Sequence, residues 1–199
     1  EFTSRYPNTM VVYASKAFVN PALAILVHEE GLGLDVVSGG ELATANAVEF
    51  PPEQIYFHGN NKTPDELEFA LKSEIGRVVV DGLYELGLLN DLARDRGVTQ
   101  DIMLRLSPSV DPHTHVHTTT GILDSKFGFS IETGDGAKAI RHALEASNLH
   151  LVGVHFHLGS PIFELEPYSI AIAAVLTFVA PFKSEGLELV EFSPGGGFA

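Results

Sequence analysis

Short runs of aliphatic and β-branched residues alternate with longer amphipathic segments along the whole chain. The runs predict strands over 10–14, 34–37, 55–57, 77–80, 102–106, 151–156 and 187–192. The longer segments predict helices over 20–30, 41–48, 64–72, 83–96, 136–147 and 166–185. Because single helices separate the strands, we expect the strands to run parallel, with right-handed crossovers.

This order of elements fits two α/β architectures, a doubly wound open sheet and a closed barrel. The first four predicted strands begin about 21 to 24 residues apart, which suits the repeat of a (βα)8 TIM-type barrel. Seven of the eight strands that a barrel needs can be counted. No shift in composition marks a second domain. We therefore expect residues 1–199 to be one barrel domain, truncated at its C-terminal end and part of a longer polypeptide.

Two helix starts are indicated by capping sequences. Ser38 is followed three residues later by Glu41, and Thr63 is followed by Pro64 and Glu66. Both have the spacing of a capping box, in which the two side chains bind each other's backbone N–H groups. We predict that helices begin at these two positions.

Composition narrows the class of protein. The 199 residues are 45% hydrophobic and 19% charged, as in a soluble globular domain. A net charge of −14 disfavours nucleic acid and anionic membrane surfaces as partners. The absence of cysteine excludes disulfides and a cysteine nucleophile, and fits a cytoplasmic protein. The apolar stretch 168–182 is shorter than the roughly 20 residues of a membrane span, so it predicts a buried helix.

Lys16 is the first residue with candidate chemistry. It lies at the end of the first apolar run, and a period of two would place it on the strand face that also carries Val12 and Ala14. Desolvation favours the neutral amine, which attacks carbonyl groups and forms Schiff bases. The alternative is a lysine at a strand end that reaches into solvent.

Other polar residues follow the later strands, where parallel α/β folds collect their functional groups. In chain order these residues are Asp35, His58 to Lys62, Arg105, His155, His157, Ser160, Gly195, Gly196 and Gly197. We expect them to share one rim with Lys16. Since His155 and His157 alternate, only one of them is expected to face the barrel interior.

Two glycine turns, at Gly39–Gly40 and Gly195–Gly197, are candidate phosphate cradles. Glycine lets backbone N–H groups approach an anion, and the Ser160 hydroxyl would add a donor. Each turn can also be read simply as a tight loop. Neither matches a dinucleotide or triphosphate motif.

The segment 107–129 is longer than a usual βα loop, which predicts a lid or an interface loop. It contains His113, His115 and His117, with Asp111 as the nearby acid. Threonines surround these histidines and no thiolate is present, so we predict no metal site.

The chain resembles the fold-type III pyridoxal phosphate enzymes, in particular the diaminopimelate decarboxylases, over essentially its full length. The motifs that carry the resemblance are YASKAF (13–18), LDVVSGGEL (34–42), IYFHGNNKTPDEL (55–67), LRLSPSVDPHTHVHTTTG (104–121), SKFGF (125–129), GVHFHLGSPIFELEPY (153–168) and GGGF (195–198). The resemblance implies an alanine racemase-like barrel that binds pyridoxal 5′-phosphate.

The resemblance also implies roles for single residues. Lys16 resembles the lysine that holds the cofactor as a Schiff base, and Asp35 resembles the acid that interacts with this lysine. His157 resembles the histidine that stacks on the pyridine ring. Ser160 and the turn of Gly195, Gly196 and Gly197 resemble phosphate contacts, and Arg105 matches an arginine of the pocket.

The implied reaction is the decarboxylation of meso-2,6-diaminopimelate to L-lysine, in a cytoplasmic homodimer. Rival interpretations are a decarboxylase of another basic or carrier-linked amino acid, or a barrel that binds the cofactor without turnover. In the family, the acid that pairs with the pyridine nitrogen and a C-terminal β-domain would lie beyond residue 199. The isolated chain is therefore expected to have little or no activity.

Overall fold

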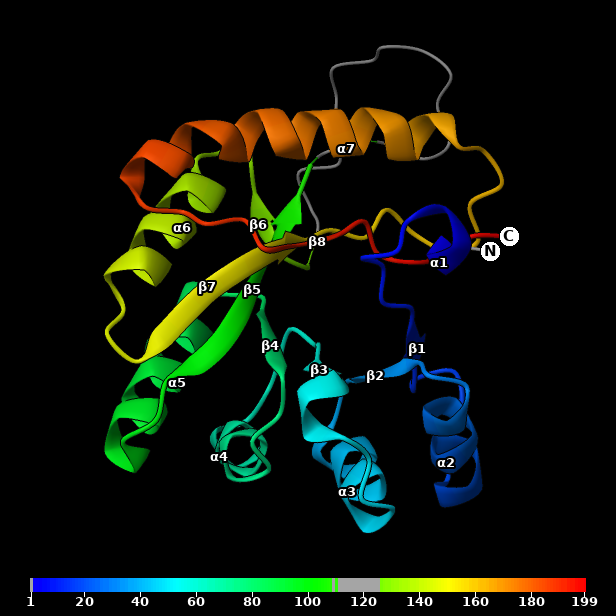
Figure 1. The fold of residues 1–199 in the computed structure, drawn as a ribbon. Helices are drawn as coiled ribbons and strands as arrows, with labels where there is room; N and C mark the ends of the chain where they lie inside the picture. The colour runs from blue at the N-terminus through cyan, green and yellow to red at the C-terminus, as the bar shows by residue number, and fades with distance from the viewer. Residues whose placement is uncertain (1, 109, 111–125) are drawn as a thin grey trace. The chain divides into compact units, whose positions relative to one another are not determined.

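The computed structural model describes residues 2–108, 110 and 126–199. The chain divides into two compact units, Glu1–Val79 and Val80–Ala199. Strands and helices alternate through both units, as the hydrophobic pattern predicts (Figure 1). The histidines at 113, 115 and 117, Asp111 and most of the predicted lid segment lie outside the described residues.

The first unit is a parallel sheet with one helix after each strand. Its strands are β1 (Val12–Ala14), β2 (Gly33–Val36), β3 (Ile55–Phe57) and β4 (Arg77–Val80), the last at the boundary between the units. They pair in this order, and all pairs are parallel. The α-helices are α1 (Phe2–Arg5), α2 (Pro21–Glu29), α3 (Gly39–Ala47) and α4 (Pro64–Lys72), and η1 (Pro52–Gln54) is a 3₁₀ turn. Helices α2, α3 and α4 lie side by side (Figure 1).

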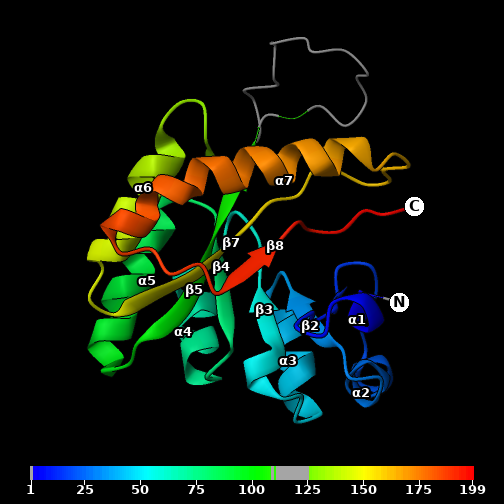
Figure 2. The same ribbon diagram turned by 45° about the horizontal axis from the view of Figure 1, so that its top comes forward.

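The second unit repeats the same plan. Its strands are β5 (Gln100–Ser107), β6 (Phe129–Ser130), β7 (Leu149–His155) and β8 (Glu191–Ser193). Strand β7 lies between β5 and β8, β6 pairs with β5, and all pairs are parallel. The helices are α5 (Leu83–Arg96), α6 (Asp135–Glu145), α7 (Glu166–Val179) and the 3₁₀ helix η2 (Ala180–Glu185). Helix α6 lies beside the end of α7 in both views (Figures 1 and 2), and Arg141 of α6 pairs with Glu185 of η2.

Aliphatic side chains bury the central strands. Leu34 and Val36 of β2, and Ile55 and Phe57 of β3, are all fully buried. Parallel strands covered by helices read as continuous apolar runs, because both of their faces are buried. The burial of these strands therefore agrees with the parallel α/β prediction, which is confirmed.

All seven predicted strands are present, and the differences from the prediction have local causes. The predicted helix 166–185 becomes 3₁₀ after Val179, because Pro181 has no N–H and its ring crowds the preceding turn. The predicted strand 187–192 begins only at Glu191. Leu187 still donates its N–H to the Phe182 carbonyl at 3.0 Å, which completes the helix end. The two-residue strand β6 was not predicted.

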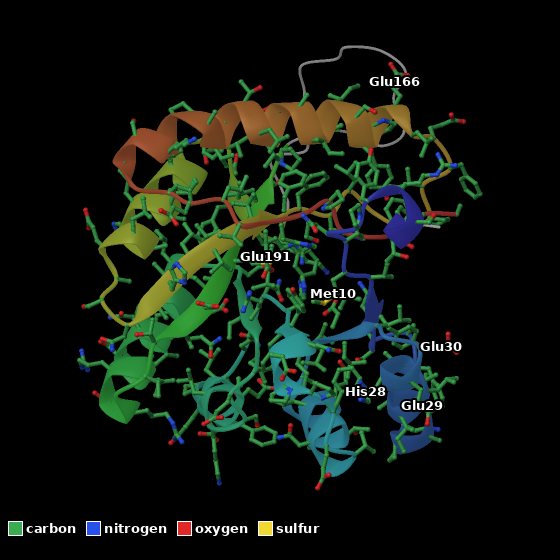
Figure 3. All side chains as sticks on the ribbon, in the orientation of Figure 1. Met10, His28, Glu29, Glu30, Glu166 and Glu191 are labelled. Carbon is green, nitrogen blue, oxygen red and sulfur yellow. The ribbon has the colours of Figure 1, made fainter. Side chains whose placement is uncertain are left out.

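Residues Glu166–Glu185 have the length and hydropathy of a membrane span, although only by those two measures. In the structure Tyr168, Ala171, Val175 and Val179 form a buried stripe along α7, while Glu166 projects outward (Figure 3). This spacing is that of a helix that packs one face on its own domain. We therefore assign α7 to the packing of the second unit.

Candidate active site

The first unit carries Lys16, which follows β1 directly. The strand ends at Ala14, where the Ser15 N–H makes the last ladder hydrogen bond, to the Asp35 carbonyl. The backbone then turns, and the Ala17 N–H donates back to the Ala14 carbonyl. Lys16 thus lies beyond the strand, not on the strand face that a period of two would give it, and its exposure matches the alternative of a strand-end lysine that reaches into solvent. Lys16 is exposed in the turn, and its neighbour Ser15 is the buried residue, 2% exposed.

Asp35 lies on β2, in register with Ala14 of β1 and Tyr56 of β3. Its carboxylate Oδ2 lies 3.8 Å from Nε2 of His58, which follows β3. The backbone N–H of His58 donates to the Val36 carbonyl at 2.8 Å, which holds the backbone of His58 beside β2. The structure thus places the His58 imidazole beside the carboxylate of Asp35, the predicted acid. The sequence motif HGNNK contained this histidine but did not indicate its partner.

The loop after β3 is held by Lys62. Its amine donates to the carbonyls of Gly59 at 2.7 Å and Val79 at 2.9 Å. An ammonium group that donates to two carbonyls has a structural role, since it ties the loop to the end of β4. Of these two lysines of the first unit, Lys16 is therefore the one whose amine lies exposed in a turn at a strand end.

The glycine turn at Gly39–Gly40 is the N-terminus of α3, and carboxylates already occupy it. The Gly39 N–H donates to Glu66 Oε1 at 2.8 Å, and the Val37 N–H donates to Glu41 Oε2 at 2.7 Å. Burial raises the pKa of Glu66, but hydrogen bonds from Thr63 and Gly39 outweigh it and hold the pKa below its usual value. An ionised carboxylate there would repel a phosphate, so this turn is not the phosphate cradle.

In the second unit, the loop after β7 and the glycine turn after β8 pack closely together. A Cβ at Gly195 would lie 2.5 Å from the Phe156 carbonyl and 3.0 Å from His157 Nδ1, and a Cβ at Gly197 would overlap the Gly159 carbonyl. Both glycines also have left-handed φ angles, +75° and +93°. Only glycine permits this approach, so the turn is built around the loop that carries His157.

The two histidines of β7 have different environments. His155 ends the strand, is buried, and lies with Nδ1 2.9 Å from Ser193 Oγ. His157 lies beyond the strand, and the Gly196 N–H lies 3.5 Å from its Nδ1. His157 is therefore the histidine whose ring lies against the glycine turn, and its predicted stacking on the cofactor ring stays a prediction. Ser160 is exposed at the end of the same loop.

Arg105, near the end of β5, is held by a buried acid that the sequence did not indicate. Its Nη1 lies 3.6 Å from Oδ2 of Asp81, whose side chain is 5% exposed. The other oxygen of Asp81 accepts the Gly128 N–H at 2.6 Å, and the guanidinium Cζ lies 4.3 Å from the centroid of the Phe127 ring. Asp81 immediately follows β4, so it belongs to the same set of strand ends as the predicted site residues.

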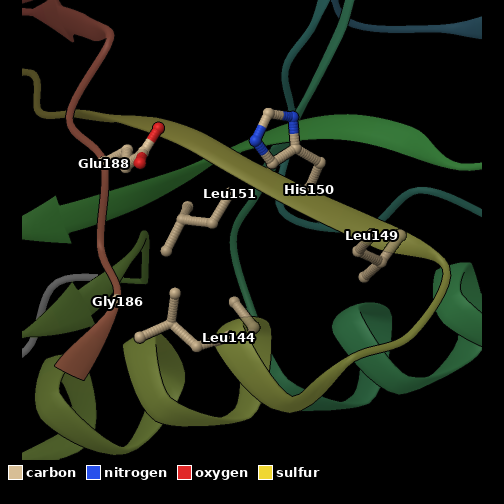
Figure 4. Close-up of a pocket in the computed structure, with 7 residues that line it drawn as sticks. Leu144, Leu149, His150, Leu151, Gly186 and Glu188 are labelled. Carbon is tan, nitrogen blue, oxygen red and sulfur yellow. The ribbon is translucent and has the colours of Figure 1, made fainter.

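A shallow hollow elsewhere on the second unit lies between α6, β7 and the segment after η2 (Figure 4). Leucines 144, 149 and 151 line it, together with His150 and Glu188. It lies at the amino end of β7, opposite to the end that carries His155. Functional groups of parallel α/β folds gather at the carboxyl ends of strands, so this hollow is not the candidate active site.

The residues present fit an anionic aldehyde cofactor such as pyridoxal phosphate. The first unit offers an exposed lysine at a strand end, and the second offers a glycine turn with open space beside Gly196, where a Cβ would have no neighbour within 4 Å. Such a turn can admit a phosphate to its N–H groups. Among the described residues, no cluster of histidine and carboxylate side chains could hold a metal ion.

Comparison with known proteins identifies the class. Residues 1–199 match the family described as pyridoxal-dependent decarboxylase, pyridoxal binding domain. The chain belongs to this family. The predicted cofactor and the predicted family are confirmed.

The particular relatives are diaminopimelate decarboxylases. The enzyme of Bacillus subtilis is 45% identical over 99% of this chain and 45% of its own length. The Methanocaldococcus jannaschii diaminopimelate decarboxylase, solved in complex with L-lysine, has a TM-score of 0.89 and 37% identity over 100% of this chain and 46% of its own. A lysine/ornithine decarboxylase from Vibrio vulnificus, complexed with cadaverine, has a TM-score of 0.79 and 25% identity over 98% of this chain and 48% of its own.

These likenesses settle the fold, which is part of a TIM-type (βα) barrel, as predicted from the strand spacing. They also show how much of its relatives' length the chain covers. It spans about half the length of the relatives that it matches.

Proposed function

We propose that this chain is the cofactor-binding part of a diaminopimelate decarboxylase, which converts meso-2,6-diaminopimelate to L-lysine and carbon dioxide. The observation that carries the proposal is the 45% identity to the Bacillus subtilis enzyme across 99% of the chain. The glycine-only turn beside His157 supports it, because backbone N–H groups in such a turn are donors of the kind that bind a phosphate.

Lys16 and Asp35 are the proposed covalent anchor and its acid. Lys16 is exposed at the carboxyl end of β1, where its amine can reach a ligand carbonyl, and Ser15 binds the Asp35 backbone at 2.9 Å. The amine must be neutral to attack a carbonyl group. The Asp35 carboxylate is therefore proposed to take part in moving the proton of the Lys16 amine. His58, 3.8 Å from Asp35, is proposed to orient that carboxylate.

The second unit is proposed to hold the ring and the phosphate. His157 supplies a flat imidazole for stacking, and Ser160 and the N–H groups of Gly195, Gly196 and Gly197 supply donors for the phosphate. The Gly195 and Gly196 N–H groups would then exchange their long hydrogen bonds, 3.4 Å to Ser193 Oγ and 3.5 Å to His157 Nδ1, for the phosphate oxygens. Arg105 supplies a fixed positive charge in a chain of net charge −14. When bound, pyridoxal phosphate supplies an electron sink for the bond that loses carbon dioxide.

The substrate assignment is tested on the protein that contains this chain. Purified protein is incubated separately with meso-diaminopimelate, ornithine, arginine and lysine, and carbon dioxide and the amine product are measured. L-lysine formed from meso-diaminopimelate alone is the expected result. Preferred turnover of ornithine or lysine would instead favour the activity named for the Vibrio vulnificus relative.

The anchor is tested by borohydride reduction and peptide mass spectrometry. We expect the trapped cofactor on Lys16 and not on Lys62, whose amine already donates to two carbonyls. Lys16→Ala should abolish trapping, whereas Lys72→Ala, at the exposed end of α4, should retain it. Trapping on another lysine would refute the assignment.

We further propose that the whole protein is a cytoplasmic homodimer. The 199 residues given contain no cysteine, which is consistent with a reducing compartment for this part of the protein. Light scattering of the whole protein tests the oligomeric state, and a monomer at micromolar concentration would contradict the proposed assembly.

A further inference from the structure

Tyr168 of helix α7 contacts the glycine turn Gly195–Gly197. It lies in the first turn of α7 and is 6% exposed. Its hydroxyl donates to the carbonyl of Gly196 at 2.7 Å. Its ring lies 4.9 Å from the ring of Phe198, centroid to centroid. Burial raises the pKa of the phenol, so the hydroxyl remains a protonated donor at neutral pH.

This hydrogen bond controls more than one backbone group. The peptide bond between Gly196 and Gly197 is trans and planar, so its N–H points away from its carbonyl. When Tyr168 holds the Gly196 carbonyl, it also sets the direction of the Gly197 N–H. The next carbonyl, that of Gly197, accepts the Ile162 N–H at 2.8 Å. The two carbonyls are thus held by the first turn of α7 and by the segment that precedes it.

Glycine backbone does not keep such an orientation by itself. Gly195 and Gly197 have left-handed φ angles, and Gly196 has open space where a Cβ would lie. Since glycine has the widest choice of backbone conformations, a peptide plane in this turn can rotate unless another group holds it. A tyrosine hydroxyl on a packed helix is a rigid support for that purpose.

We propose that Tyr168 is a positioning residue for the phosphate site, whose hydroxyl aims the Gly197 N–H at the phosphate of the cofactor. This inference rests on the proposed function, because the proposed function identifies the turn as the phosphate site. Tyr168 does not touch the cofactor. It acts through the Gly196 carbonyl.

The test compares pyridoxal phosphate with pyridoxal, which lacks the phosphate. Dissociation constants are measured by equilibrium dialysis on the cofactor-free whole protein, for the wild type and for Tyr168→Phe. The variant keeps the ring contact with Phe198 and loses only the hydroxyl. We expect about three- to tenfold weaker binding of pyridoxal phosphate, the effect of one hydrogen bond, and unchanged binding of pyridoxal.

Two further variants separate positioning from folding. Tyr84→Phe removes a hydroxyl from a side chain that is 82% exposed on α5, and it should change neither constant. Phe198→Leu removes the ring contact but keeps the Tyr168 hydroxyl, so the ratio of the two constants should stay at the wild-type value. The ratio is unaffected if part of a variant preparation is unfolded.

Each outcome decides the matter. If Tyr168→Phe weakens the binding of both ligands equally, Tyr168 supports the fold in general. If it changes neither dissociation constant, the positioning role is also refuted. A wild type that binds neither ligand would refute the proposed function, and the positioning role with it. A wild type that binds pyridoxal phosphate while Tyr168→Phe keeps the wild-type ratio would refute only the positioning role.

Discussion

Glu66 connects the N-termini of two helices, and its removal is the sharpest test of the first unit. Its carboxylate accepts the N–H and the hydroxyl of Thr63, each at 2.9 Å, and the Gly39 N–H at 2.8 Å. It thereby completes the capping box of α4 and also binds the first turn of α3. Glu66→Ala removes all three bonds at once.

The expected loss follows from these contacts. Loss of one N-terminal cap costs about 1 kcal/mol, and Glu66 serves two helices, so Glu66→Ala should cost about 2 kcal/mol of unfolding free energy. Glu66→Gln keeps an acceptor oxygen but loses the charge that favours both helix N-termini. We expect it to cost about half as much, or about 1 kcal/mol.

Urea unfolding of the whole protein, followed by far-UV circular dichroism, measures these losses. Amide hydrogen exchange at Gly39 and Thr63 adds a local readout, which should accelerate in Glu66→Ala. Glu29→Ala is the control, because Glu29 is exposed at the end of α2 (Figure 3) and its loss should change stability by less than about 0.5 kcal/mol. A change of that small size in Glu66→Ala would refute the reasoning.

The pH dependence has a definite sign. Because hydrogen bonds lower the folded pKa of Glu66, despite the opposing effect of burial, its contribution is present above the unfolded value of about 4.3. The contribution is lost as the pH falls through the folded pKa. The stability difference between wild type and Glu66→Gln should therefore be full at neutral pH and vanish in acid. A difference that grows with acid would contradict the assignment.

Three other substitutions test the second unit. Gly197→Ala should abolish binding of pyridoxal phosphate in equilibrium dialysis, because the methyl group would overlap the Gly159 carbonyl; retained affinity would exclude this turn as the phosphate site. Asp81→Asn leaves Arg105 without its buried partner and should lower the unfolding free energy by about 3 kcal/mol in urea titration, whereas a neutral effect would mean that the pair is dispensable. Phe156→Ala removes a fully buried ring and should cost about 3–5 kcal/mol, and a loss below about 1 kcal/mol would show that the core collapses around it.

The elements that could be predicted from sequence are those with local signals. The helices Pro64–Lys72 and Leu83–Arg96 were predicted with their observed ends, because one begins with Thr63 and proline and the other ends at Gly97 in the left-handed conformation. Strand β6 has two residues and pairs only with β5, so it has no periodicity to detect. The first strand was predicted to end at residue 14, as observed, but a period of two still placed Lys16 on the strand face, because the apolar run does not show where the backbone turns. The turn is closed by the Ala17 N–H, which donates to the Ala14 carbonyl, and the alternation of apolar residues does not reveal such a bond.

The two glycine turns, Gly39–Gly40 and Gly195–Gly197, differ in their tertiary partners, which a sequence motif does not reveal. Each follows a strand, β2 or β8, and each could be interpreted as a phosphate cradle. Glu66 distinguishes them: it lies 27 residues after Gly39 and fills that turn with a carboxylate, whereas the turn at Gly195–Gly197 packs on a histidine loop and keeps open space at Gly196. The carboxylate at Gly39 already supplies the negative charge that this helix N-terminus favours, so it disfavours a second anion there. The choice between equivalent glycine motifs therefore depends on the charge of their tertiary partners and on the space that those partners leave.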